Sequence, residues 1–135
     1  MQKTNIKRQF DKTPVSIGDH IRKRRLELGL LQKDVAKRIK VTEDCITNWE
    51  NNRSEPMIHY LPAIIQFLGY SPQTFDVKNL GDRIREYRYR KGLSFAAFGK
   101  MLRVDGSTIS SWEKSQSIPS QRNIGMLKNK LHIIK

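Results

Sequence analysis

The sequence has a single cysteine, no long apolar run and half as many acidic as basic side chains, and each shortage excludes a class of protein. Cys45 alone cannot form an internal disulfide, which is typical of a reducing compartment. No stretch of about 20 apolar residues exists, so no membrane-spanning helix is expected. The N-terminus, MQKTNIKRQFDKTPVS, is basic but lacks the apolar run of a secretory signal. We therefore expect a cytoplasmic protein that does not bind membranes.

Motifs that carry chemistry are missing as well. The sequence has no Gly-rich phosphate loop, no nucleophile-elbow pattern and no paired histidine and carboxylate, so an enzyme is not expected. The three histidines, His20, His59 and His132, are scattered without the spacing of metal ligands. We expect no metal site, no cofactor and no small-molecule ligand.

Positive charge is abundant. The 26 Lys and Arg against 13 Asp and Glu give a net charge of +13 on a 15.8-kDa chain. Residues 1–15 carry +3, residues 16–70 carry +2 and residues 71–135 carry +8, counted from the sequence. A charge of this size indicates a polyanionic partner, and a merely soluble basic protein is the alternative.

The sequence also repeats itself. The segment from Gly18 to Pro56 recurs from Gly81 to Pro119 at an offset of 63 residues without a gap. The identical pairs include Gly18 with Gly81, Arg25 with Arg88, Trp49 with Trp112, and Glu50 with Glu113. A fixed period of this kind indicates a duplicated domain, and hence two small hydrophobic cores instead of one.

Apolar residues recur at helical spacing in each copy, and no segment alternates long enough to predict a strand. The first helix is expected to begin after Ser16, to turn Ile21 and Leu28 inward and to end at Gly29. A second helix is predicted over residues 32–39, and a third follows the N-cap residues Thr42 in copy one and Asp105 in copy two. Two fourth helices are expected. In copy one Pro62 indicates either a kink or a helix that begins near Leu61, and in copy two the helix covers residues 122–131.

These patterns divide the chain into four parts. We expect a flexible basic arm over residues 1–15, a first domain over 16–70, a linker over 71–78 and a second domain over 79–135. Phe75 and Val77 are apolar and leave open a linker that docks on one domain.

The second and third predicted helices carry the functional motif. They are joined by a three-residue turn and have a small residue where they cross, Ala36 in copy one and Gly99 in copy two. The segments GLLQKDVAKRIKVTEDCITNWENNRSEP and LSFAAFGKMLRVDGSTISSWEKSQSIP resemble the helix-turn-helix domain of phage-repressor-like, Xre-type transcription regulators. The resemblance implies an all-α protein with two tandem lambda-repressor-like helix-turn-helix domains of four to five short helices each. It also implies a regulator that binds specific sequences of double-stranded DNA through the third helix of one or both domains.

The resemblance implies roles for individual residues. The base-facing candidates are Gln32, Glu43, Asp44, Thr47, Asn48, Gly106, Ser107, Ser110 and Ser111. The candidates for phosphate contacts are Lys40, Arg53, Arg83, Arg85, Lys100, Arg103 and Lys114. The candidates for structural roles are Arg25, Glu50, Trp49, Arg88, Glu113 and Trp112, with each Arg and Glu forming a partly buried ion pair.

Several positions depart from the family pattern. Leu31 stands where a capping Ser or Thr is usual, and Phe95 replaces the glutamine that touches DNA. Lys40 and Arg103 occupy a turn position where the family favours Gly, which is costly if φ is positive there. Phosphate contacts would explain both basic residues.

Glu43 and Asp44 favour a second hypothesis for copy one. Carboxylates add no affinity for a phosphate-lined groove, although they can accept a hydrogen bond from cytosine N4. We therefore expect copy one to discriminate between sequences or to contact a protein, and copy two to grip phosphates. The alternative function is a protein-interaction or antitoxin-like module, and a homodimer or other protein partner stays open.

Overall fold

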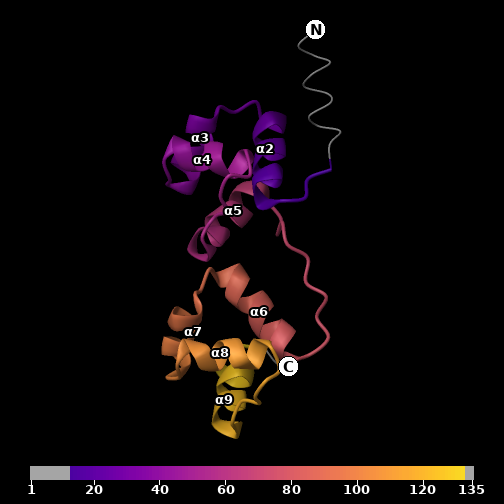
Figure 1. The fold of residues 1–135 in the computed structure, drawn as a ribbon, viewed down its shortest axis with the longest axis vertical. Helices are drawn as coiled ribbons and strands as arrows, with labels where there is room; N and C mark the ends of the chain where they lie inside the picture. Colours follow the sequence, from indigo (N-terminus) through magenta and orange to yellow (C-terminus); the bar gives the residue numbers. More distant parts are fainter. Residues whose placement is uncertain (1–12, 133–135) are drawn as a thin grey trace. The chain divides into compact units, whose positions relative to one another are not determined.

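The computed structural model describes residues 13–132, and its description of Lys130 is limited to the backbone. The expected arm at residues 1–15 therefore lies mostly outside the described residues. Those described form α-helices with short 3-10 and π turns and contain no strand, which confirms the all-α prediction. The chain divides into two compact units, with the division between Gln73 and Thr74 (Figure 1).

From residue 13 onward, the first unit contains four α-helices and a 3-10 turn, shown from indigo to magenta in Figure 1. Their bounds are α2 Ile17–Glu27, α3 Gln32–Ile39, α4 Glu43–Glu50, the 3-10 turn η1 Ile58–Tyr60 and α5 Leu61–Leu68. Helices α3 and α4 pack against each other, and α2 packs against α4. The buried apolar residues of this unit are Ile21, Val35, Ala36, Ile39, Ile46, Trp49, Leu61, Ile64, Phe67 and Leu68.

The helix ends of the first unit follow the sequence closely. Ser16 caps α2 by accepting a hydrogen bond from the Asp19 N–H at 3.0 Å. Gly29 follows α2 with φ of 67°, a backbone conformation that glycine adopts without strain. Pro62 lies in the first turn of α5, so of the two alternatives the structure has the helix that begins at Leu61.

Leu28 corrects one prediction. It is 40% exposed instead of buried in the core: Leu28 is the C-cap residue of α2, and the chain turns away at Gly29, where φ is 67°.

The second unit repeats the arrangement. Its α-helices are α6 Leu80–Lys91, α7 Phe95–Leu102, α8 Gly106–Glu113 and α9 Gln121–Gly125, and a π-helical turn η2 spans Met126–Lys130. The core residues are Ile84, Phe98, Leu102, Ile109, Trp112 and Leu127. The helix predicted over residues 122–131 is therefore α-helical only as far as Gly125. An apolar spacing of three to four residues suits both an α-helix and a wider turn, so the sequence did not distinguish them.

Two aromatic contacts fix the face of α6 and the segment before it. Tyr87 packs edge-on against Phe98 of α7, with ring centres 5.6 Å apart. Tyr89 packs edge-on against Phe75 at 5.7 Å, so this part of the expected linker docks on the second unit. Val77 is 37% exposed. Among the described residues no helix is long and apolar enough to cross a membrane.

A glycine allows the first helix of each unit to touch the end of the third helix. A Cβ atom added at Gly18 would lie 1.7 Å from the Trp49 carbonyl oxygen, and one at Gly81 would lie 2.7 Å from the Trp112 carbonyl oxygen. Real Cβ atoms do not approach backbone this closely, so any larger residue must push the two helices apart. The close backbone contact therefore explains why both copies have glycine at this position.

We predict that Gly18→Ala destabilises the first unit and Gly81→Ala the second, each by about 1–3 kcal/mol or more, because the added methyl overpacks a backbone contact. Each unit contains one tryptophan, so urea unfolding followed by fluorescence in Trp112→Phe and Trp49→Phe backgrounds reports the two units separately. Gly125→Ala is the control, since nothing lies within 4 Å of the added Cβ. Equal stability of all three variants would contradict the steric argument.

Candidate nucleic-acid interface

The turn between the second and third helices has the same backbone in both units. Lys40 ends α3 at φ 66° and ψ 50°, and Arg103 ends α7 at φ 60° and ψ 43°. This left-handed conformation costs a residue other than glycine about 1–2 kcal/mol. Both side chains are exposed. The chain thus keeps a long cation at a position where glycine would relieve strain.

The helix starts of this motif are capped differently in the two units. Thr42 Oγ1 accepts a hydrogen bond from the Cys45 N–H at 3.3 Å, whereas Asp105 occupies the N-cap of α8 without a side-chain cap bond. Leu31 cannot cap α3 through its side chain, but its own N–H donates to Asp34 Oδ2 at 2.9 Å. Ser94 caps α7 by accepting from the Ala97 N–H at 3.1 Å. The missing Ser or Thr at Leu31 is thus offset only in part.

A buried ion pair joins the first helix to the third in the first unit. Arg25 Nε donates to Glu50 Oε2 and Arg25 Nη2 donates to Glu50 Oε1, both at 2.8 Å. The remaining Arg25 nitrogen donates to the Leu30 carbonyl oxygen at 3.1 Å. The side chains are 13% and 2% exposed, so solvent screens the pair little. One guanidinium therefore fixes α2, the turn that follows it and the end of α4.

The second unit has the same pair. Arg88 Nε and Nη2 donate to the two carboxylate oxygens of Glu113 at 2.6 and 3.1 Å. Arg88 Nη1 donates to the Leu93 carbonyl oxygen at 3.3 Å, and both side chains are 7% exposed. Trp49 and Trp112, one residue before each glutamate, are 4% exposed and belong to the two cores.

Gln32 extends the ion pair to the middle of the third helix in the first unit. Its Nε2 donates to Glu50 Oε1 at 3.2 Å, and its Oε1 accepts from the Thr47 hydroxyl at 2.8 Å. Two residues with implied base-facing roles, Gln32 and Thr47, are thus bonded to each other and half-buried. This network holds α4 in one rotation about its axis relative to α3.

Phe95 takes the place of Gln32 in the second unit and acts differently. The Arg88 guanidinium carbon lies 3.9 Å from the centre of the Phe95 ring, which is a cation–π contact. The ring is 36% exposed. Phe95 thus stacks on the Arg88–Glu113 pair, whereas Gln32 contacts the equivalent Arg25–Glu50 pair of the first unit through a hydrogen bond. The sequence signalled the position but not this role, because a phenylalanine at an exposed helix start also fits a surface contact.

The other base-facing candidates of the first unit lie along the outer side of α4. Glu43 and Asp44 in its first turn are exposed, and Asn48 is half-buried. The described residues give these three side chains no ion-pair partner. The exposed carboxylates of Glu43 and Asp44 are therefore accessible to a partner.

The second unit offers less side-chain chemistry at the matching positions. A Cβ atom added at Gly106 would lie 2.9 Å from the Ala96 nitrogen, so this position faces the start of α7. The Ser111 hydroxyl lies 2.8 Å from the Ser117 hydroxyl in the following loop, and either can donate. Ser107 is exposed and Ser110 is half-buried. Short hydroxyls and a glycine leave α8 with little reach toward base edges.

The phosphate candidates are all exposed and fall into four places. Lys40 and Arg103 lie in the turn, and Lys100 is on α7. Arg53 and Lys114 follow the third helices of the two units. The remaining two, Arg83 and Arg85, lie on α6 but on different faces: Arg85 lies 5.4 Å from the Tyr89 ring centre, whereas Arg83 lines a hollow with Tyr87 and Arg90.

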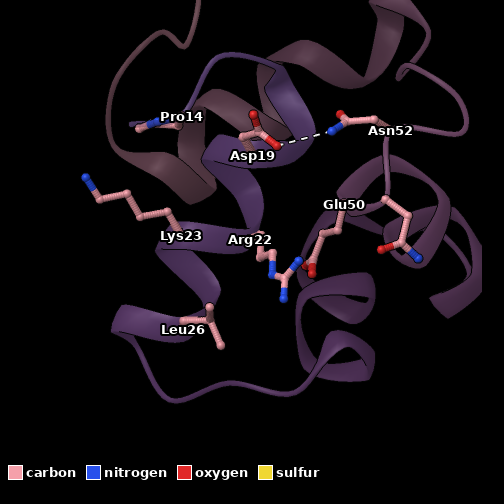
Figure 2. Close-up of a pocket in the computed structure, with 8 residues that line it drawn as sticks. Pro14, Asp19, Arg22, Lys23, Leu26, Glu50 and Asn52 are labelled. Atoms are coloured by element: carbon pink, nitrogen blue, oxygen red, sulfur yellow. Dashed lines mark hydrogen bonds between the residues drawn. The ribbon is translucent and has the colours of Figure 1, made fainter. Parts of the chain in front are cut away.

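The loop after α4 is fastened to the start of α2, which the sequence did not reveal. Asn52 Nδ2 donates to Asp19 Oδ1 at 3.3 Å, the dashed line in Figure 2, and the Ser16 hydroxyl donates to Asn52 Oδ1 at 2.6 Å. Asn52 has φ of 59°, a conformation that Asn tolerates better than most residues. The sequence signal that could have pointed to this left-handed residue is an asparagine just past the end of a helix. Ser115 holds the matching position at φ 59° in the second unit.

These contacts also affect the Asp19 carboxyl. Burial works to raise its pKa, but hydrogen bonds from the backbone N–H groups of Val15 and Ser16 and from Asn52 outweigh burial and hold the pKa below the usual range. A hollow of about 300 Å³ lies beside this network, with Arg22 directed toward Glu50 (Figure 2). Arg22 Nε is buried without a hydrogen-bond partner among the described residues.

Among residues 13–132 no group of three or more His, Cys, Asp or Glu is arranged to hold a metal ion. The free thiol of Cys45 is half-buried and accepts a hydrogen bond from the Thr42 hydroxyl at 3.2 Å. Cys45 therefore takes part in the contacts with Thr42 at the start of α4.

Comparison with protein families agrees with the geometry. A family described as "Helix-turn-helix", the Xre-type group, matches residues 21–75, and a family described as "Helix-turn-helix domain" matches residues 79–127. Such domains bind DNA and are typical of regulators that are not enzymes. No curated protein and no solved structure gives a significant match to the chain.

Proposed function

Because the chain belongs to the helix-turn-helix family, with an Xre-type domain followed by a second helix-turn-helix domain, we propose that it is a regulator of transcription that recognises a specific double-stranded DNA sequence. The third helix of each unit, α4 or α8, enters the major groove, and the turn before it approaches the phosphates. The protein acts in the cytoplasm on DNA.

The observation that carries the proposal is a pair of basic residues whose backbone is in the left-handed conformation. Lys40 and Arg103 occupy equivalent turns, both with positive φ and both exposed. Each unit accepts strain that glycine would remove and gains a charge beside the start of its third helix. A contact with phosphate explains why both copies keep this combination.

The two units divide the work in this proposal. The first reads bases through Glu43, Asp44 and Asn48, which project from the outer side of α4. Gln32 and Thr47 keep α4 oriented and stand next to those groups. Its phosphate contacts come from Lys40 and Arg53.

The second unit supplies most of the backbone grip. Residues 71–135 carry +8, and the cations proposed for phosphate contact are Arg85, Lys100, Arg103 and Lys114. The short side chains of α8 allow close approach to a groove but little discrimination between bases. With two readers in one chain, a monomer suffices to contact two positions on the DNA.

A second candidate function rests on Glu43 and Asp44. These exposed carboxylates at the start of α4 also suit a basic protein surface, in which case the first unit contacts a protein partner, as in an antitoxin-like module. The two functions differ in one consequence: the DNA sequence that is bound depends on Glu43 and Asp44 only if these residues contact bases.

We predict that Lys40→Gly with Arg103→Gly raises the free energy of unfolding and weakens DNA binding at the same time. Replacing a residue in the left-handed conformation with glycine removes backbone strain and is expected to add about 1–2 kcal/mol per site to the free energy of unfolding. Loss of two phosphate contacts makes the dependence of log K on log salt shallower by about two. Urea unfolding and fluorescence anisotropy with a labelled duplex at several salt concentrations measure both effects.

The control is Ser115→Gly, which relieves a left-handed residue of φ 59° without removing a charge. It is expected to stabilise the second unit and to leave the salt dependence as in the parent protein. An unchanged salt dependence in the Lys40 and Arg103 variant would remove the phosphate role of the two turns.

We predict that Glu43→Gln with Asp44→Asn changes the DNA sequence recovered by selection from a random duplex pool, because amides both donate to and accept from base edges whereas carboxylates only accept. Glu27→Gln with Glu55→Gln removes the same two charges at exposed positions outside α4 and is expected to leave the recovered sequence as it was. The same recovered sequence from both variants would favour the protein-contact function of the first unit.

A further inference from the structure

A second basic surface lies on α6, and no residue of α7 or α8 lines it. The described residues form a hollow of about 600 Å³ whose main walls are Arg83, Glu86, Tyr87, Arg90, Lys91 and His132. Arg83, Tyr87 and Arg90 follow one another at helical spacing, so they share a face of α6. Ile84 and Arg88 are buried on the core side of the same helix. The hollow is therefore distinct from the helix-turn-helix motif of the second unit.

Positive charge in the hollow is poorly balanced. Three permanent cations, Arg83, Arg90 and Lys91, converge on it, and Glu86 is the one carboxylate among the described residues that line it. Glu86 Oε1 lies 3.8 Å from an Arg90 guanidinium nitrogen in a partly exposed pair, a distance at which solvent leaves little attraction. Cations placed together in this way repel each other, and an anionic ligand would relieve that repulsion.

An aromatic ring gives the hollow a second recognition element. Tyr87 is half-buried, anchored on its core side by Phe98, and lies 5.9 Å from the Lys91 ammonium group. A fixed ring next to guanidinium groups suits a ligand that combines a planar group with phosphates, because Arg forks bind phosphate oxygens and rings stack. The volume falls in the range of small-molecule sites, about 300–1,000 Å³.

The first unit lacks this combination although it shares the fold. Its residues at the positions of Arg83, Arg90 and Lys91 are His20, Glu27 and Leu28. His20 Nδ1 is hydrogen-bonded to the Tyr70 hydroxyl at 2.8 Å, and the two rings pack edge-on at 5.6 Å. The basic hollow is thus a property of the second copy and not of the helix-turn-helix fold.

We propose that this hollow is an effector site for a small organic phosphate of the nucleoside polyphosphate class. Arg83 and Arg90 bind the phosphates with Lys91, and the Tyr87 ring contacts the planar base. The sequence alone indicated no small-molecule ligand, because only the fold places His132 beside the face of α6 that carries Arg83, Tyr87 and Arg90. The proposal stands apart from DNA recognition, which uses α3, α4, α7 and α8 and, on α6, only Arg85 beside Tyr89 and not the residues of the hollow.

The test is calorimetric titration of ATP into the full chain at about 150 mM salt, where weak nonspecific attraction is screened. Arg90→Gln with Lys91→Gln is expected to weaken ATP binding about tenfold or more, since charge-assisted contacts of phosphate are lost. Lys100→Gln with Arg103→Gln removes the same charge from the other surface. It is expected to keep ATP binding and to lose affinity for a random duplex.

Two further measurements separate the sources of phosphate. Inorganic tripolyphosphate is expected to bind more weakly than ATP because it has no base for Tyr87, and equal or tighter binding would reject the nucleoside class. Absence of ATP binding, or equal loss in the two double variants, would overturn the site. A loss of duplex affinity in the Arg90 and Lys91 variant as large as in the Lys100 and Arg103 variant would assign the hollow to the DNA backbone instead.

Discussion

One arginine in each unit holds three parts of the fold together. Arg25 and Arg88 bind both carboxylate oxygens of a glutamate at the end of the third helix, and each also binds a carbonyl oxygen in the turn after the first helix. Gly18 and Gly81 allow the backbones to come close enough for this. Removing one partner of a buried pair typically costs about 3–5 kcal/mol, which is large for a domain of this size. The orientation of the third helix, and with it every proposed DNA contact, depends on this arrangement.

The same frame carries different surfaces in the two copies. Gln32 connects the first ion pair to Thr47 by hydrogen bonds, whereas Phe95 stacks on the second ion pair. Residue types that preserve the core were kept, and residues around it changed: carboxylates on one third helix, hydroxyls on the other, and a basic hollow on α6 alone. Duplication thus supplied two stable supports, and divergence at exposed positions gave each its own proposed partner chemistry.

The sequence predicted what depends on periodicity and caps. It placed α3 at its observed bounds and the two tryptophans in the cores, and it gave a start of α5 near Leu61 as one of two alternatives, because apolar spacing and Pro or Ser signals are local. It missed features that depend on distant segments. Asn52 meets Asp19 only in the folded unit, and the division of Arg83 from Arg85 depends on which face of α6 packs. The π turn after Gly125 escaped because it keeps the same apolar spacing.

The most direct test of the account is amide chemical-shift mapping of the full chain with its selected DNA duplex. The account predicts that shifts concentrate in α3 and α4 of the first unit and in α7 and α8 of the second, with Lys40 and Arg103 among the most affected. It also predicts that α5 and α9 change little. Shifts that gather on α5 or α9, or that leave both third helices unperturbed, would contradict the proposal that each unit presents its third helix to DNA.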